Sequence, residues 1–200
     1  MIVDELIDYK KQGRELIFDL DNTIYKERDF LFLAYQKIAN ILFKKKESEV
    51  FDFLTTEFLE KGRSCLFDKL VDEFSIDEII TVDCCIEVLR NTYCDKCLFA
   101  YPWFYKFLNK AGKDFKLKII TNGNIQQQKN KIQSLDLGVK DNSIEVVFSN
   151  STKPKPSSAS YFSLYEVEKF YKPIYVGDSE IDREFCNNIG INFYDVSKLL

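Results

Sequence analysis

Short apolar runs alternate with segments of helical pattern along most of the chain, and this alternation restricts the fold more than any other feature. The expected strands are 16–18, 115–120, 145–148, 173–176 and 191–194, and the helices that accompany them are 2–12, 103–110, 125–135, 157–170 and 180–188. Strands that alternate with helices form a parallel sheet with helices on both faces. The sequence therefore predicts an α/β fold, a doubly wound parallel sheet.

One long stretch departs from this alternation. Residues 26–97 contain no clear strand pattern, and helices are expected at 28–45, at 47–61 and from Ser75 to about residue 92. Glu78 lies three residues after Ser75, as in a capping box. We therefore expect an α/β core made of residues 1–25 and 98–200, with residues 26–97 inserted as an α-helical cap.

Composition excludes several classes of function. The 200 residues include no histidine, which removes Ser-His-Asp and Cys-His catalysis and His-ligated zinc. The net charge of −4 argues against a nucleic-acid partner, because such proteins usually carry a basic patch; the lysines at 44–46 are expected to be a solvated helix end. No run reaches the ~18 apolar residues that span a bilayer, and the first residues lack the basic start of a signal peptide. We expect a cytoplasmic protein without a membrane partner.

The six cysteines are expected to be free thiols, as is usual in a cytoplasmic chain. Cys94 and Cys97 form a lone C-x-x-C pair, without a second pair at zinc-finger spacing. Structural zinc or redox chemistry at this pair stays open as the alternative.

Polar residues follow several of the expected strands directly. They are Asp19 and Asp21, Thr121, Asp178 and Asp182, joined by the loop 153–156 (KPKP). Taken singly, each has an ordinary structural explanation as a turn or a helix cap. In open parallel sheets, however, ligands bind outside the carboxyl ends of the strands. Together these residues predict one shared crevice.

The same residues carry a family pattern. The segments are 16–23 (LIFDLDNT), 119–123 (IITNG), 153–154 (KP) and 177–182 (GDSEID). In this order they resemble the four motifs of the haloacid dehalogenase-like (HAD) hydrolase superfamily. The resemblance implies a Rossmann-like core, and the helical stretch falls where one cap class is inserted, after the first motif.

The resemblance also implies the roles of individual residues. Asp19 is expected to attack phosphorus and form an aspartyl-phosphate, and Asp21 to protonate the leaving oxygen and later activate water. Thr121 and Lys153 would hold phosphate oxygens. Lys155 is the less favoured lysine, because the family pattern places the lysine before the first proline.

Backbone groups near Leu20, Asn122 and Gly123 are expected to contribute to phosphate binding. The implied cofactor is Mg²⁺, with Asp19, Asp178 and the backbone carbonyl of Asp21 as ligands. Asp182 would act indirectly, orienting the lysine or a metal-bound water.

The acid at position 21 indicates the reaction class. Dehalogenases of the superfamily lack an acid there, and phosphonatases need a cap lysine that nothing in this sequence singles out. We therefore expect a Mg²⁺-dependent phosphatase acting on a small phosphorylated metabolite, a sugar phosphate or nucleoside monophosphate. A phosphomutase and a non-catalytic phosphate-binding relative stay open as alternatives.

Two further features bear on the substrate. The segment 121–132 resembles phosphatases of sialic acid phosphates and some nucleoside monophosphatases, although it could equally be a helix that packs on the core. Tyr25, Arg28 and Arg63 are candidates for contacting the substrate, since arginine binds carboxylates and phosphates well. A helical cap would favour small substrates over proteins.

Overall fold

A five-stranded parallel sheet forms the centre of the protein. The computed structural model describes residues 2–74, 80–165 and 173–199. In chain order the strands are β1 (Leu16–Phe18), β2 (Leu117–Thr121), β3 (Ile144–Phe148), β4 (Ile174–Gly177) and β5 (Asn192–Asp195). They lie in the order β3-β2-β1-β4-β5, and each pairs in parallel with its neighbours. The predicted α/β fold with a parallel sheet is confirmed.

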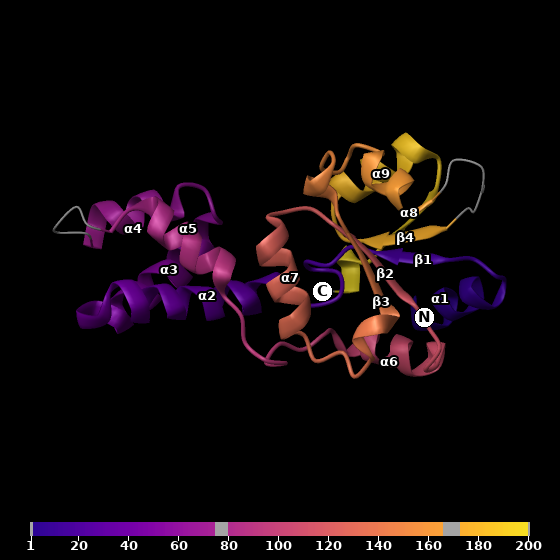
Figure 1. The fold of residues 1–200 in the computed structure, drawn as a ribbon, viewed down its shortest axis with the longest axis horizontal. Helices are drawn as coiled ribbons and strands as arrows, with labels where there is room; N and C mark the ends of the chain where they lie inside the picture. Colours follow the sequence, from indigo (N-terminus) through magenta and orange to yellow (C-terminus); the bar gives the residue numbers. More distant parts are fainter. Residues whose placement is uncertain (1, 75–79, 166–172, 200) are drawn as a thin grey trace.

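Helices cover both faces of the sheet (Figure 1). The helices of the core are α1 (Ile2–Lys11), α6 (Pro102–Ala111), α7 (Ile125–Ser134), α8 (Ala159–Leu164) and α9 (Glu180–Ile189). Side chains alternate between the two faces of a strand. Phe18 therefore packs against Phe104 of α6, with ring centroids 5.4 Å apart, whereas Ile17 belongs to a second cluster that contains Tyr161 and Phe185.

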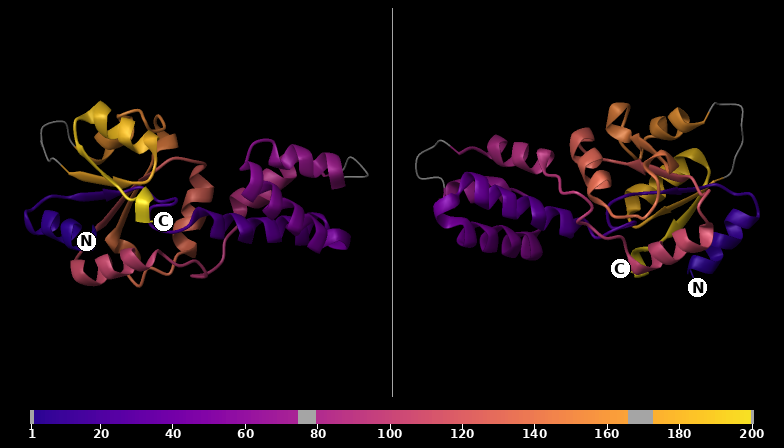
Figure 2. Two further views of the ribbon diagram at one scale, coloured as in Figure 1. Left: turned by 180° about the vertical axis from the view of Figure 1, so that it is seen from behind. Right: turned by 60° about the horizontal axis from the view of Figure 1, so that its bottom comes forward.

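The inserted helices form a group of their own beside α7 (Figures 1 and 2). They are α2 (Glu27–Leu42), α3 (Glu47–Lys61), α4 (Leu66–Phe74) and α5 (Val82–Asn91), with a short 3-10 helix at Lys44–Lys46. Three further 3-10 helices lie in the core, at Asp141–Ser143, Ser149–Ser151 and Ser197–Leu199. Aromatic side chains hold the group together, with the Tyr35 ring 6.0 Å from that of Phe58. That residues 26–97 form a separate cap stays a prediction. Among the described helices, none is long and apolar enough to cross a membrane.

The start of α5 differs from the prediction. The expected first turn, with Ser75 and Glu78, lies outside the described residues. The described helix begins at Val82, because the Thr81 side chain accepts a hydrogen bond from the backbone N–H of Cys84 at 3.4 Å and caps it. The helix expected at 157–170 is described as far as Leu164, and 166–170 again lie outside.

The two segments that join the inserted helices to the core lie side by side. Tyr101 donates its backbone N–H to the carbonyl of Ile24 at 2.8 Å, and Tyr25 forms a β-bridge with Ala100. Both connections therefore leave the core at one place. The inserted helices are anchored next to the loop that follows β1.

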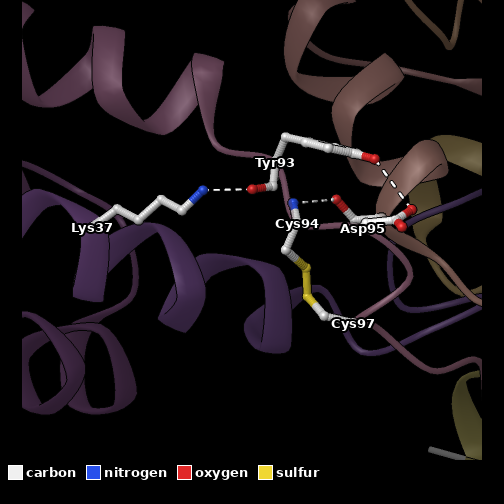
Figure 3. The surroundings of a disulfide bond; sticks show 6 residues. Lys37, Tyr93, Cys94, Asp95 and Cys97 are labelled. Atoms are coloured by element: carbon white, nitrogen blue, oxygen red, sulfur yellow. Dashed lines mark hydrogen bonds between the residues drawn. A yellow bond between two sulfur atoms is a disulfide. The ribbon is translucent and has the colours of Figure 1, made fainter.

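A disulfide joins Cys94 and Cys97 in the second of these segments (Figure 3). The expectation of free thiols is wrong for this pair. A turn with Lys96 at φ 46° brings the two Cα atoms to 5.8 Å, a separation that a disulfide spans. The sequence-based expectation rested on the cellular compartment and on the lack of a second cysteine pair, and it did not include this local turn. The free cysteines in the described part of the chain are Cys65, Cys84, Cys85 and Cys186.

Candidate active site

A small acidic cavity lies at the carboxyl ends of the central strands. Asp19 follows β1 and Asp178 follows β4, the pair of strands at which the chain changes its direction of progress across the sheet. This is where open α/β sheets bind ligands. The cavity measures about 200 Å³, and its lining comprises Asp19, Asp21, Asn22, Thr121, Asn122, Lys155, Asp178, Ser179, Ile181 and Asp182. The predicted convergence of distant polar residues is present in the fold.

The lysine in this cavity is Lys155. Its Nζ lies 2.6 Å from Oδ1 of Asp19, 2.6 Å from Oδ1 of Asp182 and 2.7 Å from the Tyr175 hydroxyl. Lys153 is exposed and does not line the cavity. The assignment of the third-motif lysine to Lys153 was therefore wrong.

The loop before α8 decides which lysine enters the site. The Asn122 side chain accepts the backbone N–H of Lys155 at 2.8 Å and donates to the Lys155 carbonyl at 3.0 Å. This two-point contact docks the second of the two Lys-Pro pairs against the sheet. Because both lysines precede a proline, the local pattern could not distinguish them.

Asp182 orients Lys155 from the first turn of α9. Its Oδ1 accepts from Lys155, and its Oδ2 accepts from the Ser179 hydroxyl at 2.6 Å in a capping box. Gly177 is needed for this arrangement, since a Cβ there would lie 2.7 Å from Oδ2 of Asp182. The sequence led us to expect that Asp182 orients Lys153 or a metal-bound water, whereas the lysine that Asp182 contacts is Lys155.

The cluster of carboxylates has an excess of negative charge. Asp19, Asp178 and Asp182 each place an oxygen within 4.8 Å of the others, and Lys155 is the ammonium group that contacts Asp19 and Asp182. Burial raises the pKa of Asp19 above its usual range despite the nearby ammonium of Lys155. Burial and the neighbouring Asp182 raise the pKa of Asp178 to about 6. A bound cation would relieve this repulsion.

The donor set fits a hard divalent cation, which prefers oxygen ligands. Both oxygens of Asp182 already accept hydrogen bonds from Lys155 and Ser179. Asp19 and Asp178 are therefore the carboxylates best placed to bind the metal directly. The contribution of the Asp21 backbone carbonyl stays a prediction.

Asp21 has its own set of partners, separate from this cluster. Its Oδ1 accepts from the Tyr25 hydroxyl at 2.8 Å, and its Oδ2 accepts from Gln128 at 3.0 Å and Lys131 at 2.7 Å. Burial alone would raise the pKa of Asp21, but Lys131 and these hydrogen bonds hold that pKa below its usual value. Gln128 and Lys131 belong to the segment 121–132 that resembles a phosphatase subgroup, but their contacts with Asp21 were not expected from the sequence. The signal was their three-residue spacing, which places both on one face of α7.

Of the other residues predicted to bind phosphate, Thr121 lines the cavity, whereas Gly123 and Leu20 do not. Thr121 accepts a hydrogen bond from Gln128 at 3.2 Å. Gly123 donates its N–H to Asn150 at 2.9 Å, so this donor is already engaged, and Leu20 is buried. The contribution of the Leu20 backbone to phosphate binding stays a prediction.

The candidate substrate residues also differ from one another. Tyr25 is buried and contacts Asp21, whereas Arg28 is exposed. Arg63 forms an ion pair with Glu27 at the start of α2. Tyr25 therefore supports Asp21 directly, whereas Arg63 is linked to Asp21 through Glu27 and Lys131.

Comparison with known families identifies the chain. The family described as haloacid dehalogenase-like hydrolase matches residues 16–196. The chain belongs to the haloacid dehalogenase-like hydrolase family. Its acidic cluster lies in the segments 16–23 and 177–182 that carry the family pattern, and Lys155 directly follows the segment 153–154.

Several solved HAD structures share this fold. YfnB of Bacillus subtilis, described as a HAD-hydrolase bound to magnesium, is 18% identical, with 90% of this chain and 86% of that chain covered and a TM-score of 0.53. A protein of Thermotoga maritima described as a β-phosphoglucomutase is 16% identical, with 91% and 84% covered and a TM-score of 0.55. One of Lactobacillus plantarum described as a phosphoglycolate phosphatase is 14% identical, with 90% and 84% covered and a TM-score of 0.50. No curated protein matches the sequence.

Proposed function

We propose that this HAD hydrolase is a Mg²⁺-dependent phosphatase of small phosphate monoesters and that Asp19 is its nucleophile. The observation that carries the proposal is the division of the carboxylates of the site into two groups. Asp19 shares Lys155 with Asp182, next to Asp178, while Asp21 is held by Lys131 and Gln128. A nucleophile and an acid–base group need such different surroundings.

Asp19 and Asp178 would hold Mg²⁺, and Asp182 would keep Lys155 in place. The bound cation would neutralise part of the charge that otherwise keeps an anionic carboxylate and an anionic phosphate apart. Lys155 would stabilise phosphate oxygens from the same side, because its ammonium group already contacts Asp19 at 2.6 Å. Thr121 would add a hydroxyl donor.

In the reaction, a carboxylate oxygen of Asp19 attacks phosphorus and the bond from phosphorus to the leaving oxygen breaks. Asp21 gives its proton to that oxygen, and it later takes a proton from the water that hydrolyses the aspartyl-phosphate. The surroundings of Asp21 keep it ionised in the ligand-free protein. A bound phosphate dianion raises the pKa of a nearby carboxyl group, which favours the protonated form that the first step needs.

The inserted helices limit the substrate to a small molecule. Arg63 pairs with Glu27 at the start of α2, and the cavity of about 200 Å³ suits a small substrate. We propose that residues 26–97 act as the cap and that the substrate is a small phosphorylated metabolite.

The test is a screen of phosphorylated metabolites with and without Mg²⁺. We expect release of inorganic phosphate that requires the metal, with the Asp19→Asn variant as the blank. Metal-independent release would contradict the proposed site. Formation of an isomer without inorganic phosphate would show a mutase instead.

Metal binding itself has a readout that needs no substrate. At a Mg²⁺ concentration about 100 times Kd, we expect the melting temperature to rise by roughly 5–10 °C. Asp178→Asn should abolish this rise because it removes a ligand. Glu180→Gln is the matched control, since Glu180 is exposed and pairs with Arg183 outside the cavity. A full rise in Asp178→Asn would refute the assignment of that ligand.

Asp21→Asn should slow substrates according to their leaving group. An alkyl phosphate needs the proton, so its kcat should fall by about 10²- to 10⁴-fold. The kcat for p-nitrophenyl phosphate, whose leaving group needs little protonation, should fall far less. Steady-state kinetics on both substrates measure the difference. Equal losses on the two substrates would count against the acid–base role.

A further inference from the structure

A buried lysine that is not among the residues expected from the family motifs lies directly against Asp21. Lys131 of α7 is 1% exposed, and its Nζ is 2.7 Å from Oδ2 of Asp21 and 2.9 Å from Oε1 of Glu27. Burying an ammonium group is costly unless it is paired and hydrogen-bonded. Lys131 meets this condition through two carboxylates that belong to the loop after β1 and to the first turn of α2.

We propose that Lys131 is the positioning residue for Asp21, which it holds in place and links through Glu27 to Arg63 in the loop between α3 and α4. The inference rests on the proposed role of Asp21 as the acid–base group. Lys131 does not line the cavity, so it acts through Asp21 and not on the substrate.

The contacts around Asp21 explain why Lys131 is needed. Both oxygens of the carboxylate accept hydrogen bonds, Oδ1 from the Tyr25 hydroxyl and Oδ2 from Lys131 and Gln128. Lys131 is the charged donor of the three, and charge-assisted hydrogen bonds are the strongest. Without it, the carboxylates of Asp21 and Glu27 would face each other across a buried gap. Repulsion between them would turn Asp21 away from its present orientation.

The same lysine links the site to the inserted helices. Glu27 accepts from Lys131 with one oxygen, and its other oxygen pairs with Arg63 in the loop between α3 and α4. Positive and negative groups therefore alternate from Asp21 to Arg63. One continuous series of ion pairs therefore connects Asp21, the proposed acid–base group, with the inserted helices.

The decisive kinetic experiment compares leaving groups in Lys131→Met and Lys131→Arg. We expect Lys131→Met to lower kcat for an alkyl phosphate about 100-fold and for p-nitrophenyl phosphate less than about fivefold, because a misplaced proton donor harms poor leaving groups most. Lys131→Arg, which keeps a cation, should recover much of the loss. The ratio of the two kcat values in one preparation does not depend on how much of the variant is folded. Equal losses on both substrates would overturn the proposal.

Two comparisons show whether Lys131 acts through Asp21. In an Asp21→Asn background, Lys131→Met should change the leaving-group ratio no further, since coupled residues are not additive. An additional full loss would overturn the proposal. Lys118→Met is the matched control: Lys118 is also largely buried and paired, but its partners are Glu15 at 3.1 Å and Glu145 at 3.9 Å and not Asp21. Its ratio should equal that of the unaltered protein.

Crystal structures of the two variants give a readout without turnover. In Lys131→Met we expect the Asp21 carboxylate to leave Tyr25 and Gln128, while Asp19 and Lys155 keep their contact. In Lys131→Arg the Asp21 carboxylate should stay. An unmoved carboxylate in Lys131→Met would overturn the positioning role even if no phosphatase activity were found. Absence of activity in the unaltered protein would refute the proposed function alone.

Discussion

Replacing Asp19 with asparagine is expected to lower kcat by at least about 10⁴-fold, on every substrate that the protein hydrolyses. An amide oxygen is a poor nucleophile and cannot form the aspartyl-phosphate, so neither half of the reaction can proceed. The loss should be similar for p-nitrophenyl phosphate and for alkyl phosphates, because it does not depend on the leaving group. Steady-state kinetics on both substrates measure it, and this uniform loss distinguishes Asp19 from Asp21.

The fold of the Asp19→Asn variant should be intact. Burial disfavours the charged form of Asp19, so its removal should leave the metal-free melting temperature unchanged or raise it. Lys155 keeps Asp182 and the Tyr175 hydroxyl as partners. Mass spectrometry should verify that the asparagine has not reverted to aspartate. Residual activity above about one hundredth of the original would refute Asp19 as the nucleophile.

Removing the Lys155 ammonium group is expected to affect stability and activity together. Lys155→Met leaves Asp19 and Asp182 buried without their shared cation, and loss of one partner of a buried pair typically costs about 3–5 kcal/mol in the free energy of unfolding. Activity should fall by at least about 10²-fold, because a group that stabilises the phosphate oxygens is gone. Urea unfolding and kcat measure the two effects.

Lys153→Met is the matched control for this experiment. Lys153 is exposed, so its replacement should change the free energy of unfolding by less than about 0.5 kcal/mol and leave kcat within about twofold. The two lysines are two residues apart and both precede a proline, so their local sequences are equivalent. A difference between the two variants therefore reports the position of each lysine in the fold. If Lys153→Met were inactive and Lys155→Met active, the placement of the loop 153–156 would be incorrect.

The two lysine–carboxylate groups differ in the charge that they leave uncompensated. Around Asp21, the charges of Glu27 and Asp21 are matched by Lys131 and Arg63. Around Asp19, three carboxylates lie close to one ammonium group. A divalent cation is therefore expected to bind the side chain of Asp19 and not the side chain of Asp21. This difference supports assigning metal binding to one aspartate side chain and proton transfer to the other.

Local sequence determined the elements of the core and the identity of its acidic residues. Runs such as 16–18 and 174–177 are apolar because each strand is buried on both faces, and such a run can be recognised without knowledge of its neighbours. Asp19, Asp21 and Asp178 stand where those runs end. Because parallel strands place their carboxyl ends at one edge, their convergence follows from the order of elements along the chain.

Tertiary structure decided which lysine enters the site and what holds Asp21. Lys153 and Lys155 have equivalent local sequences, and the choice between them depends on the Asn122 side chain, more than 30 residues away, which hydrogen-bonds the backbone of Lys155. Lys131 resembles any helix lysine until the fold buries it between Asp21 and Glu27. Local patterns report burial and turn chemistry, whereas the pairing of charges depends on contacts between distant segments, and these form only when the chain has folded.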